Sequence, residues 1–250
     1  LSHDNVLSIV EVNQDNLWIG TANGLNYFNI KNAQFTPYHH KPNDANSLSH
    51  NNVFSIIKGS KDNLWIGTRA GLNLFNTKNG QFTHYRHQEN NPNSLSHDLV
   101  YSVIKDSQGN IWAGTGGGGL NYFDIKNQQF TQYRYQSNNP NSLRNNNVFR
   151  IVEDNQSNIW IGTVGGGVNR FNIKNESFTH YSHQTNNINS LSHNNVFSIV
   201  EDSQGDLWVG IQAGGLNYFN SKNKQFTHYS HQEGNSNSLS SDIVSSVIEG

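Results

Sequence analysis

The chain has 250 residues, a formal net charge of −2 at pH 7 and only 14% charged residues, and it contains neither cysteine nor methionine. The lack of cysteine excludes disulfides and thiolate metal sites, and the near-neutral charge offers no basic surface to a nucleic-acid partner. No apolar run reaches the roughly 18 residues of a membrane-spanning helix. The chain begins at Leu1 with no start residue and no signal peptide, so we expect a processed segment of a longer protein.

A single pattern recurs along the whole sequence. Each copy begins at a leucine, and the copies are spaced by 47 or 48 residues, at Leu1, Leu48, Leu95, Leu143, Leu191 and Leu239. Repeats of this length are typical of solenoids and propellers. We expect one domain over residues 1–250, with full repeats at 1–47, 48–94, 95–142, 143–190 and 191–238, and the start of a further repeat at 239–250.

Each repeat predicts four short strands in chain order, which we call a, b, c and d. In the second repeat these are "NNVFSIIKG", "LWIGT", "LNLFN" and "QFTHYRH", separated by turns rich in glycine, asparagine and aspartate. No stretch has the apolar spacing of a helix. Four antiparallel strands in such a unit are typical of a β-propeller blade. We therefore expect an all-β propeller of five full repeats plus one extra innermost strand at residues 243–248.

Strand b is apolar on both faces, as expected where a sheet packs between two neighbouring sheets. A tryptophan occupies the same place in every repeat, at Trp18, Trp65, Trp112, Trp160 and Trp208. Burying an indole of roughly 150–250 Å² at about 25 cal/mol/Å² contributes on the order of 4–6 kcal/mol per repeat. We predict that these five tryptophans form the structural core.

The motif "NLWIGTRAGLNLFN" at 63–76, which follows "NNVFSIIKG", resembles the two-component regulator propeller repeat. The resemblance covers essentially the whole chain. It implies the sensor propeller of bacterial hybrid histidine kinases, located in the periplasm or outside the cell, where it binds a ligand or a protein partner. The kinase, the receiver and the small β-sandwich that normally accompany such a propeller are absent from this sequence.

Three motifs suggest cofactor or metal sites, but each has a simpler structural interpretation. The run "GTGGGG" at 114–119 matches a dinucleotide-binding pattern, yet it precedes a strand and not the helix that such a site requires. The pairs His84/His87, His180/His183 and His228/His231 lie three residues apart on strands, so their side chains point to opposite faces. Asp154 and Asp202 fit hairpin turns better than a calcium loop. We expect no cofactor, no metal, and solvated histidines on the outer strand.

The repeat pattern also argues against catalysis. No nucleophile with a fixed base and no carboxylate pair departs from the repeat as a unit, and the departures present are scattered. Lyases of propeller fold exist, but no residue here stands out to carry such chemistry. We therefore predict a protein that is not an enzyme.

Binding is expected on the face where the d–a connections and the b–c turns meet. The residues just before strand a ring the channel mouth of a propeller, and we call them the rim residues: His3, His50, His97, Asn145 and His193, with Ser241 in the last segment. They either cap their own loops or form a polar, titratable rim for a small anion, a glycan hydroxyl or a partner loop. Arg69, Arg144 and Arg170 break the repeat on or near this face, and we add them to the predicted ligand-binding residues; the family usually has an arginine at the position of Arg170.

Two functions remain open. One is a sensing or interaction module that binds a ligand or protein partner, and the alternative is a multivalent lectin-like propeller with one weak glycan site per repeat. The segment 243–248 would leave Val244, Val247 and Ile248 exposed if nothing paired with it. We therefore expect a longer parent chain or self-association through open blade ends.

Overall fold

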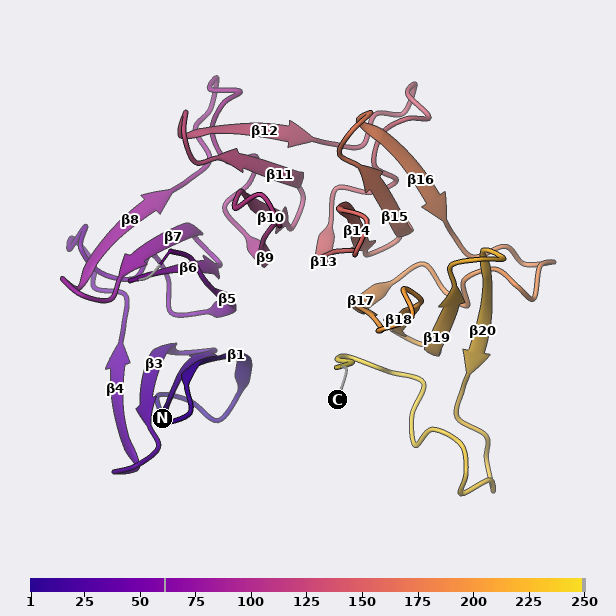
Figure 1. Ribbon diagram of the computed structural model, residues 1–250, viewed down its shortest axis with the longest axis horizontal. Helices are drawn as coiled ribbons and strands as arrows, with labels where there is room; N and C mark the ends of the chain where they lie inside the picture. The colour runs from indigo at the N-terminus through magenta and orange to yellow at the C-terminus, as the bar shows by residue number, and fades with distance from the viewer. Residues whose placement is uncertain (61, 249–250) are drawn as a thin grey trace. The chain divides into compact units, whose positions relative to one another are not determined.

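The computed structural model describes residues 1–60 and 62–248, and over these residues the chain forms five four-stranded antiparallel sheets without helices. In every sheet the strands lie side by side in chain order (Figure 1). The prediction of five all-β repeats of four strands is confirmed. Contacts divide the chain into two compact units, Leu1–Gln132 and Tyr133–Gly250, which are described separately below.

The first unit holds three sheets. Their strands are β1 (Val6–Asn13), β2 (Asn16–Thr21), β3 (Gly24–Asn29) and β4 (Gln34–Tyr38); β5 (Val53–Lys58), β6 (Asn63–Thr68), β7 (Gly71–Asn76) and β8 (Gln81–Tyr85); and β9 (Val100–Lys105), β10 (Ile111–Thr115), β11 (Gly119–Asp124) and β12 (Gln129–Tyr133), whose last residue belongs to the second unit. Strands a to d of each repeat correspond to these four strands in order.

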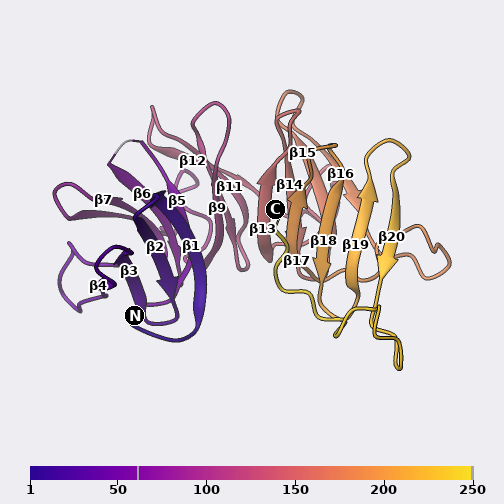
Figure 2. The ribbon, with the colours of Figure 1, turned by 60° about the horizontal axis from the view of Figure 1, so that its bottom comes forward.

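The second unit holds two sheets. Their strands are β13 (Val148–Glu153), β14 (Asn158–Thr163), β15 (Gly167–Asn172) and β16 (Ser177–Tyr181); and β17 (Val196–Glu201), β18 (Leu207–Ile211), β19 (Gly215–Asn220) and β20 (Gln225–Tyr229). Figure 2 shows the strands of the last sheet side by side from β17 to β20.

Within each unit, one repeated contact joins each sheet to the next. The tryptophan of one sheet meets the edge of a strand-c phenylalanine from the next, with ring centroids 5.6 Å apart for Trp18 and Phe75 and 5.5 Å apart for Trp160 and Phe219. The glycine two residues after the tryptophan allows the inner strand of the next sheet to come close. A Cβ at Gly162 would lie 2.6 Å from Cγ1 of Val196 on the next inner strand, so only glycine fits there.

A buried polar bond explains the repeated "SLS" and "GLN" motifs. Asn73, fully buried on β7, accepts a hydrogen bond from the Ser49 N–H at 2.9 Å and donates to the Ser49 hydroxyl at 2.8 Å. Asn26 makes the same two bonds with Ser2, and Asn217 makes them with Ser192. Because a buried amide is stable only when hydrogen-bonded, this pair fixes each loop to its own sheet.

The extra innermost strand expected at 243–248 is not confirmed, because those residues carry no strand assignment and pair with no strand among the described residues. The segment still lies along the fifth sheet. The N–H of Val244 donates to the carbonyl of Ile211 at 3.1 Å, and the N–H of Val247 donates to the Ser198 hydroxyl at 3.0 Å. Residues 249–250 of the expected further repeat lie outside the described residues.

Candidate functional site

The rim residues cap their own loops. In each, a side-chain atom accepts a hydrogen bond from the main-chain N–H two residues later: His50 Nδ1 from Asn52 at 2.9 Å and Asn145 Oδ1 from Asn147 at 2.8 Å. The same bond is made by His3, His97, His193 and Ser241. A histidine that accepts through Nδ1 in its neutral form carries its proton on Nε2. The rim histidines therefore each retain an Nε2–H donor beyond the capping bond.

The d–a connections and the b–c turns lie together within each unit. The N–H of Arg69, in a b–c turn, donates to the carbonyl of Asn52 at 3.3 Å, and the N–H of Gly71 donates to the carbonyl of Asp98 in the next repeat at 2.6 Å. In the second unit, both Gly165 and Gly167 donate to the carbonyl of Asn194 at 3.0 Å. The rim residues thus stand beside the glycine turns of their units.

Among the rim histidines, His50 has a pKa that its surroundings lower. Burial lowers the pKa of His50 below its ordinary value of 6.5, and the nearby positive charges of Arg69 and, to a smaller extent, His40 lower it further. The neutral form is also the one that can accept the bond from Asn52. Desolvation, charge and hydrogen bonding therefore all favour a neutral His50 at neutral pH.

The fourth repeat departs from the others at this loop. Arg144 stands where the other repeats have the serine that pairs with the buried asparagine, and its side chain is exposed. Its N–H still donates to Asn169 Oδ1 at 3.1 Å, but the Nδ2 of Asn169 is buried and has no hydrogen-bond partner. The next residue, Asn145, replaces the rim histidine of the other full repeats.

Arg170 lies apart from the rim. It sits on β15 opposite Trp160, and its guanidinium carbon is 5.7 Å from the centre of the indole ring. Its Nε is 3.6 Å from Asp154 Oδ2, and its terminal nitrogen donates to the Gln156 side chain at 3.1 Å. Asp154 and Gln156 belong to the a–b turn, so the structure does not bring Arg170 together with Arg144 or the rim residues.

Arg150 is a further departure that the sequence analysis missed. It occupies, on inner strand β13, the position of Ser55, whose hydroxyl accepts a hydrogen bond from Val103 on the following inner strand at 3.1 Å. The Arg150 side chain is exposed, yet the surrounding protein removes part of its hydration and lowers its pKa. Aligning the inner strands by the repeat period would have revealed it, because Ser8, Ser55, Ser102 and Ser198 fill the other places.

The histidines on and just after the outer strand were expected to be solvated, but the structure shows them hydrogen-bonded to main-chain carbonyls. His84 Nε2 donates to the Ser47 carbonyl at 2.7 Å, and His87 Nδ1 donates to the Leu95 carbonyl at 3.0 Å. The other two pairs repeat these bonds, His180 and His228 with Ser142 and Ser190, and His183 and His231 with Leu191 and Leu239. The histidines are the donors, because carbonyl oxygens can only accept. His84, His180 and His228 thus join strand d to the preceding d–a connection, whereas His87, His183 and His231 close a bond within the following connection.

The aspartates of the a–b turns bond locally. Asp154 accepts from the N–H groups of Gln156 and Asn158 and from the indole nitrogen of Trp160, and Asp202 accepts from two N–H groups of its own turn. Across residues 1–60 and 62–248, no group of three or more histidines and carboxylates could hold a metal ion.

The predicted core tryptophans differ in their surroundings. Trp18, Trp65, Trp112 and Trp160 are at most 5% exposed. Trp208 is partly exposed, and among the described residues no further sheet of the second unit follows its sheet.

The sequence matches the two component regulator propeller family model five times, at residues 1–23, 47–70, 94–117, 142–165 and 190–212. Each match covers the few residues before strand a, strands a and b, and the start of the b–c turn of one repeat. The matches and the sheet architecture define a β-propeller. The chain belongs to the two component regulator propeller family.

Two extracellular domains from B. thetaiotaomicron have similar structures. One, from the proposed hybrid two component system BT3049, aligns with 92% of this chain and 31% of its own length, at 27% identity and a TM-score of 0.78. The other, from the proposed one component system BT4673, aligns with 97% of this chain and 30% of its own, at 22% identity and a TM-score of 0.77. The chain thus spans about a third of each of these structures.

Similarity in fold extends to an enzyme. An inactive variant of virginiamycin B lyase from Staphylococcus aureus aligns with 92% of this chain and 72% of its own length, at 14% identity and a TM-score of 0.65, which indicates a shared fold alone. A comparison with curated proteins finds no significant match. Within the described residues there is no helix of the length and apolar character needed to cross a membrane.

Proposed function

We propose that this chain is a non-catalytic sensing or interaction module that binds a ligand or a protein partner on the face formed by the d–a connections and b–c turns. The family and the extracellular domains of similar structure support a sensing role and a location in the periplasm or outside the cell. No nucleophile with a fixed base and no carboxylate pair departs from the repeat as a group, and this supports a protein that does not catalyse a reaction.

The departure at Arg144 is the observation that carries this proposal. Replacing the serine of the other repeats leaves the Nδ2 of Asn169 buried without a partner, and such a group costs about 1–3 kcal/mol. Positions where a protein departs from its own local pattern at a cost in stability are expected to be functional or strained sites. The cost falls on the loop where the neighbouring rim residue, Asn145, also departs from the pattern.

The chemistry of this loop favours a ligand rich in acceptor oxygens. Arg144 offers a guanidinium and Asn145 offers its amide N–H groups, because the Oδ1 of Asn145 already accepts the bond from Asn147. In the next repeat, His193 retains its Nε2–H donor, since its Nδ1 accepts from Asn195. Guanidinium groups bind carboxylates and sulfates through two parallel hydrogen bonds. We therefore infer an anionic ligand, for which a carboxylated or sulfated sugar or an acidic peptide provides the right groups.

The lectin-like alternative gains no support, because it requires an equivalent glycan site in every repeat. The fourth repeat carries Arg144 and Asn145 where the other full repeats carry serine and histidine. A ligand that binds five equivalent sites would have to tolerate this difference.

The proposal is tested by measuring stability and binding on the same variant. Arg144→Ser restores the residue of the other repeats, so it should raise the free energy of unfolding and at the same time weaken binding. Suitable probes are uronic-acid oligosaccharides, sulfated oligosaccharides and neutral oligosaccharides of equal length, screened by thermal shift and quantified by calorimetry.

Arg86→Ser is the matched control. Arg86 is an exposed arginine at the end of strand d, and the fourth and fifth repeats have Ser182 and Ser230 at its position. This variant removes the same charge without touching the loop of Arg144, so it should change neither the free energy of unfolding nor the affinity for the ligand by much. Equal binding by wild type and Arg144→Ser, or an equal loss in both variants, would contradict the proposed site.

A further inference from the structure

The fourth repeat replaces two serines of the other repeats with arginines. Its segment at 143–150 reads "LRNNNVFR", where the second and fifth repeats read "LSHNNVFS" at 48–55 and 191–198. Arg144 belongs to the proposed binding loop, and Arg150 follows six residues later on inner strand β13. The two arginines therefore lie on one continuous segment, with Cα atoms no more than roughly 20 Å apart.

Arg150, like Arg144, gives up a structural hydrogen bond. At the same position in the second repeat, the Ser55 hydroxyl accepts from the N–H of Val103 on the next inner strand at 3.1 Å. The corresponding N–H beside Arg150 belongs to Ile199 on β17, and a guanidinium cannot accept it. The arginine thus replaces a residue that joins consecutive inner strands. Equivalent bonds are made by Ser8 and Ser198.

The guanidinium of Arg150 has no charge partner. Strand β13 lies beside β17 in the second unit (Figure 1), and the side chain of Arg150 makes no ion pair or hydrogen bond within residues 1–60 and 62–248. The carboxylates on these two strands, Glu153 and Glu201, are the last residues of each, next to the a–b turns. The surrounding protein removes part of the hydration of Arg150, which lowers its pKa. A cation that has lost hydration without gaining a carboxylate favours an incoming anion.

An aromatic pair lies next to Arg150. Phe149 is the bulged residue of β13, and its ring centroid is 5.0 Å from that of Phe197 on β17. In the third repeat, the ring at this position lies against the b–c turn, because a Cβ at Gly116 would be 2.8 Å from Cε2 of Tyr101. Bulges commonly redirect a side chain in this way. The segment between the two arginines therefore carries an apolar surface toward the turns.

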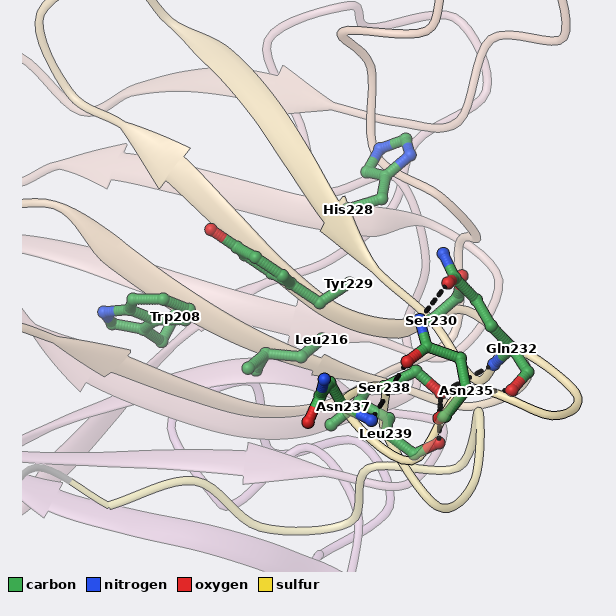
Figure 3. A pocket seen from close by; sticks show the side chains of 10 residues that line it. All are labelled: Trp208, Leu216, His228, Tyr229, Ser230, Gln232, Asn235, Asn237, Ser238 and Leu239. Carbon is green, nitrogen blue, oxygen red and sulfur yellow. Dashed lines mark hydrogen bonds between the residues drawn. The ribbon is translucent and has the colours of Figure 1, made fainter.

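The cavity of the fifth sheet does not offer such a combination. It has a volume of about 560 Å³ and is lined by residues of strands β18 to β20 and of the loop after them (Figure 3). No arginine, lysine or carboxylate is among the described residues that line it. An acidic group would find no guanidinium there, unlike at Arg144 and Arg150.

We propose that Arg150 is a second anion-binding residue of the site at Arg144, so that this site selects ligands with two acidic groups. One acidic group pairs with Arg144 at the loop and the other with Arg150 on the inner strand, while the part between them contacts Phe149 and Phe197. This inference rests on the proposed function, because Arg144 must bind the first group. Binding the first group places the second at a high effective concentration near Arg150.

Two uronic-acid oligosaccharides of equal length test this proposal, one with two carboxylates and one with a carboxylate masked as its methyl ester. In calorimetry the wild type should bind the doubly acidic probe at least about tenfold more tightly, as expected for a further hydrogen bond between charged groups. Arg150→Ser should remove this preference and leave the affinity for the singly acidic probe unchanged. Arg144→Ser should weaken the binding of both probes.

Two further variants serve as controls. Arg134→Ser removes an exposed arginine of the same unit at a position where the next two repeats have Ser182 and Ser230, so it should bind both probes like the wild type. Arg150→Lys keeps the charge but loses the planar fork, so it should keep part of the preference. Arg150→Ser restores the residue of the other repeats, and its melting temperature should therefore not fall below that of the wild type.

Failure of this inference can be told from failure of the proposed function. If Arg144→Ser weakens binding while the wild type and Arg150→Ser bind both probes alike, the proposed function stands and the role of Arg150 is overturned. If the wild type binds no anionic probe, the proposed function fails and this inference fails with it. An equal loss in Arg150→Ser and Arg134→Ser would reduce the effect to net charge and would also overturn the role of Arg150.

Discussion

The main-chain N–H of Arg144 donates a hydrogen bond to Oδ1 of Asn169 at 3.1 Å, while the amide nitrogen of the same asparagine is buried without a partner. In the second repeat, Ser49 satisfies both ends of Asn73. The fourth repeat has therefore kept one half of a paired interaction and lost the other.

Restoring the serine should stabilise the protein. We expect Arg144→Ser to raise the free energy of unfolding by about 1 kcal/mol, because its hydroxyl would accept from Asn169 Nδ2. Denaturant unfolding with an unchanged m-value would measure this directly. A lower midpoint would show that the Arg144 side chain itself stabilises the loop.

Removing a core tryptophan should be costly. Trp112 is 1% exposed, and its indole nitrogen donates to Asp106 Oδ2 at 2.9 Å. Trp112→Ala should lower the free energy of unfolding by roughly 3–5 kcal/mol, as for other large buried aromatic residues. Trp208→Ala, at the partly exposed equivalent, should cost clearly less. Equal losses would mean that Trp208 is as well packed as Trp112.

Arg170 should act on stability and not on binding. Its guanidinium contacts Asp154 and Trp160, away from the rim residues. Arg170→Ala should lower the free energy of unfolding by about 1 kcal/mol and leave ligand affinity unchanged in calorimetry. A loss of ligand affinity without a loss of stability would instead show that Arg170 belongs to the binding site, as the sequence predicted.

Stability should depend on pH through His50. Its pKa is lowered in the folded state, so the unfolded chain binds more protons once the pH falls below about 6.5, the ordinary histidine value. The contribution of neutral His50 to the free energy of unfolding is fully present above about pH 6.5. It is lost as the pH falls toward the folded-state pKa. NMR titration of the His50 ring should give a value below 6.5 that rises in Arg69→Ala. A pKa at or above 6.5 would contradict the capping bond to Asn52.

The repeat period alone was enough to predict the strands, their order and the burial of residues such as Trp112, because each repeat has the same local pattern. It could also have identified Arg150 as a departure at a serine position. The bond between His84 and the Ser47 carbonyl could not be predicted, since it joins residues 37 positions apart through a loop of no regular structure. The strand expected at 243–248 is not confirmed for a related reason: a strand is defined by pairing with a neighbouring strand, and these residues pair with none among the described residues.

The position of Arg170 shows how strand register decides where a side chain acts. The sequence marks it as a departure near a glycine turn, but its pairing with Trp160 directs it to the a–b turn and Asp154. Arg144 precedes strand a and remains at the loop. Two arginines of the same repeat therefore have different partners, which the sequence alone did not separate.

Hydrogen–deuterium exchange of the chain with and without an anionic oligosaccharide found by the screen tests the central claim most directly. Our account predicts that binding slows exchange mainly at residues 143–147 and 164–167, the d–a connection and the b–c turn of the fourth repeat. Equal protection of the corresponding loops in all five repeats, or protection confined to the outer strands, would contradict it.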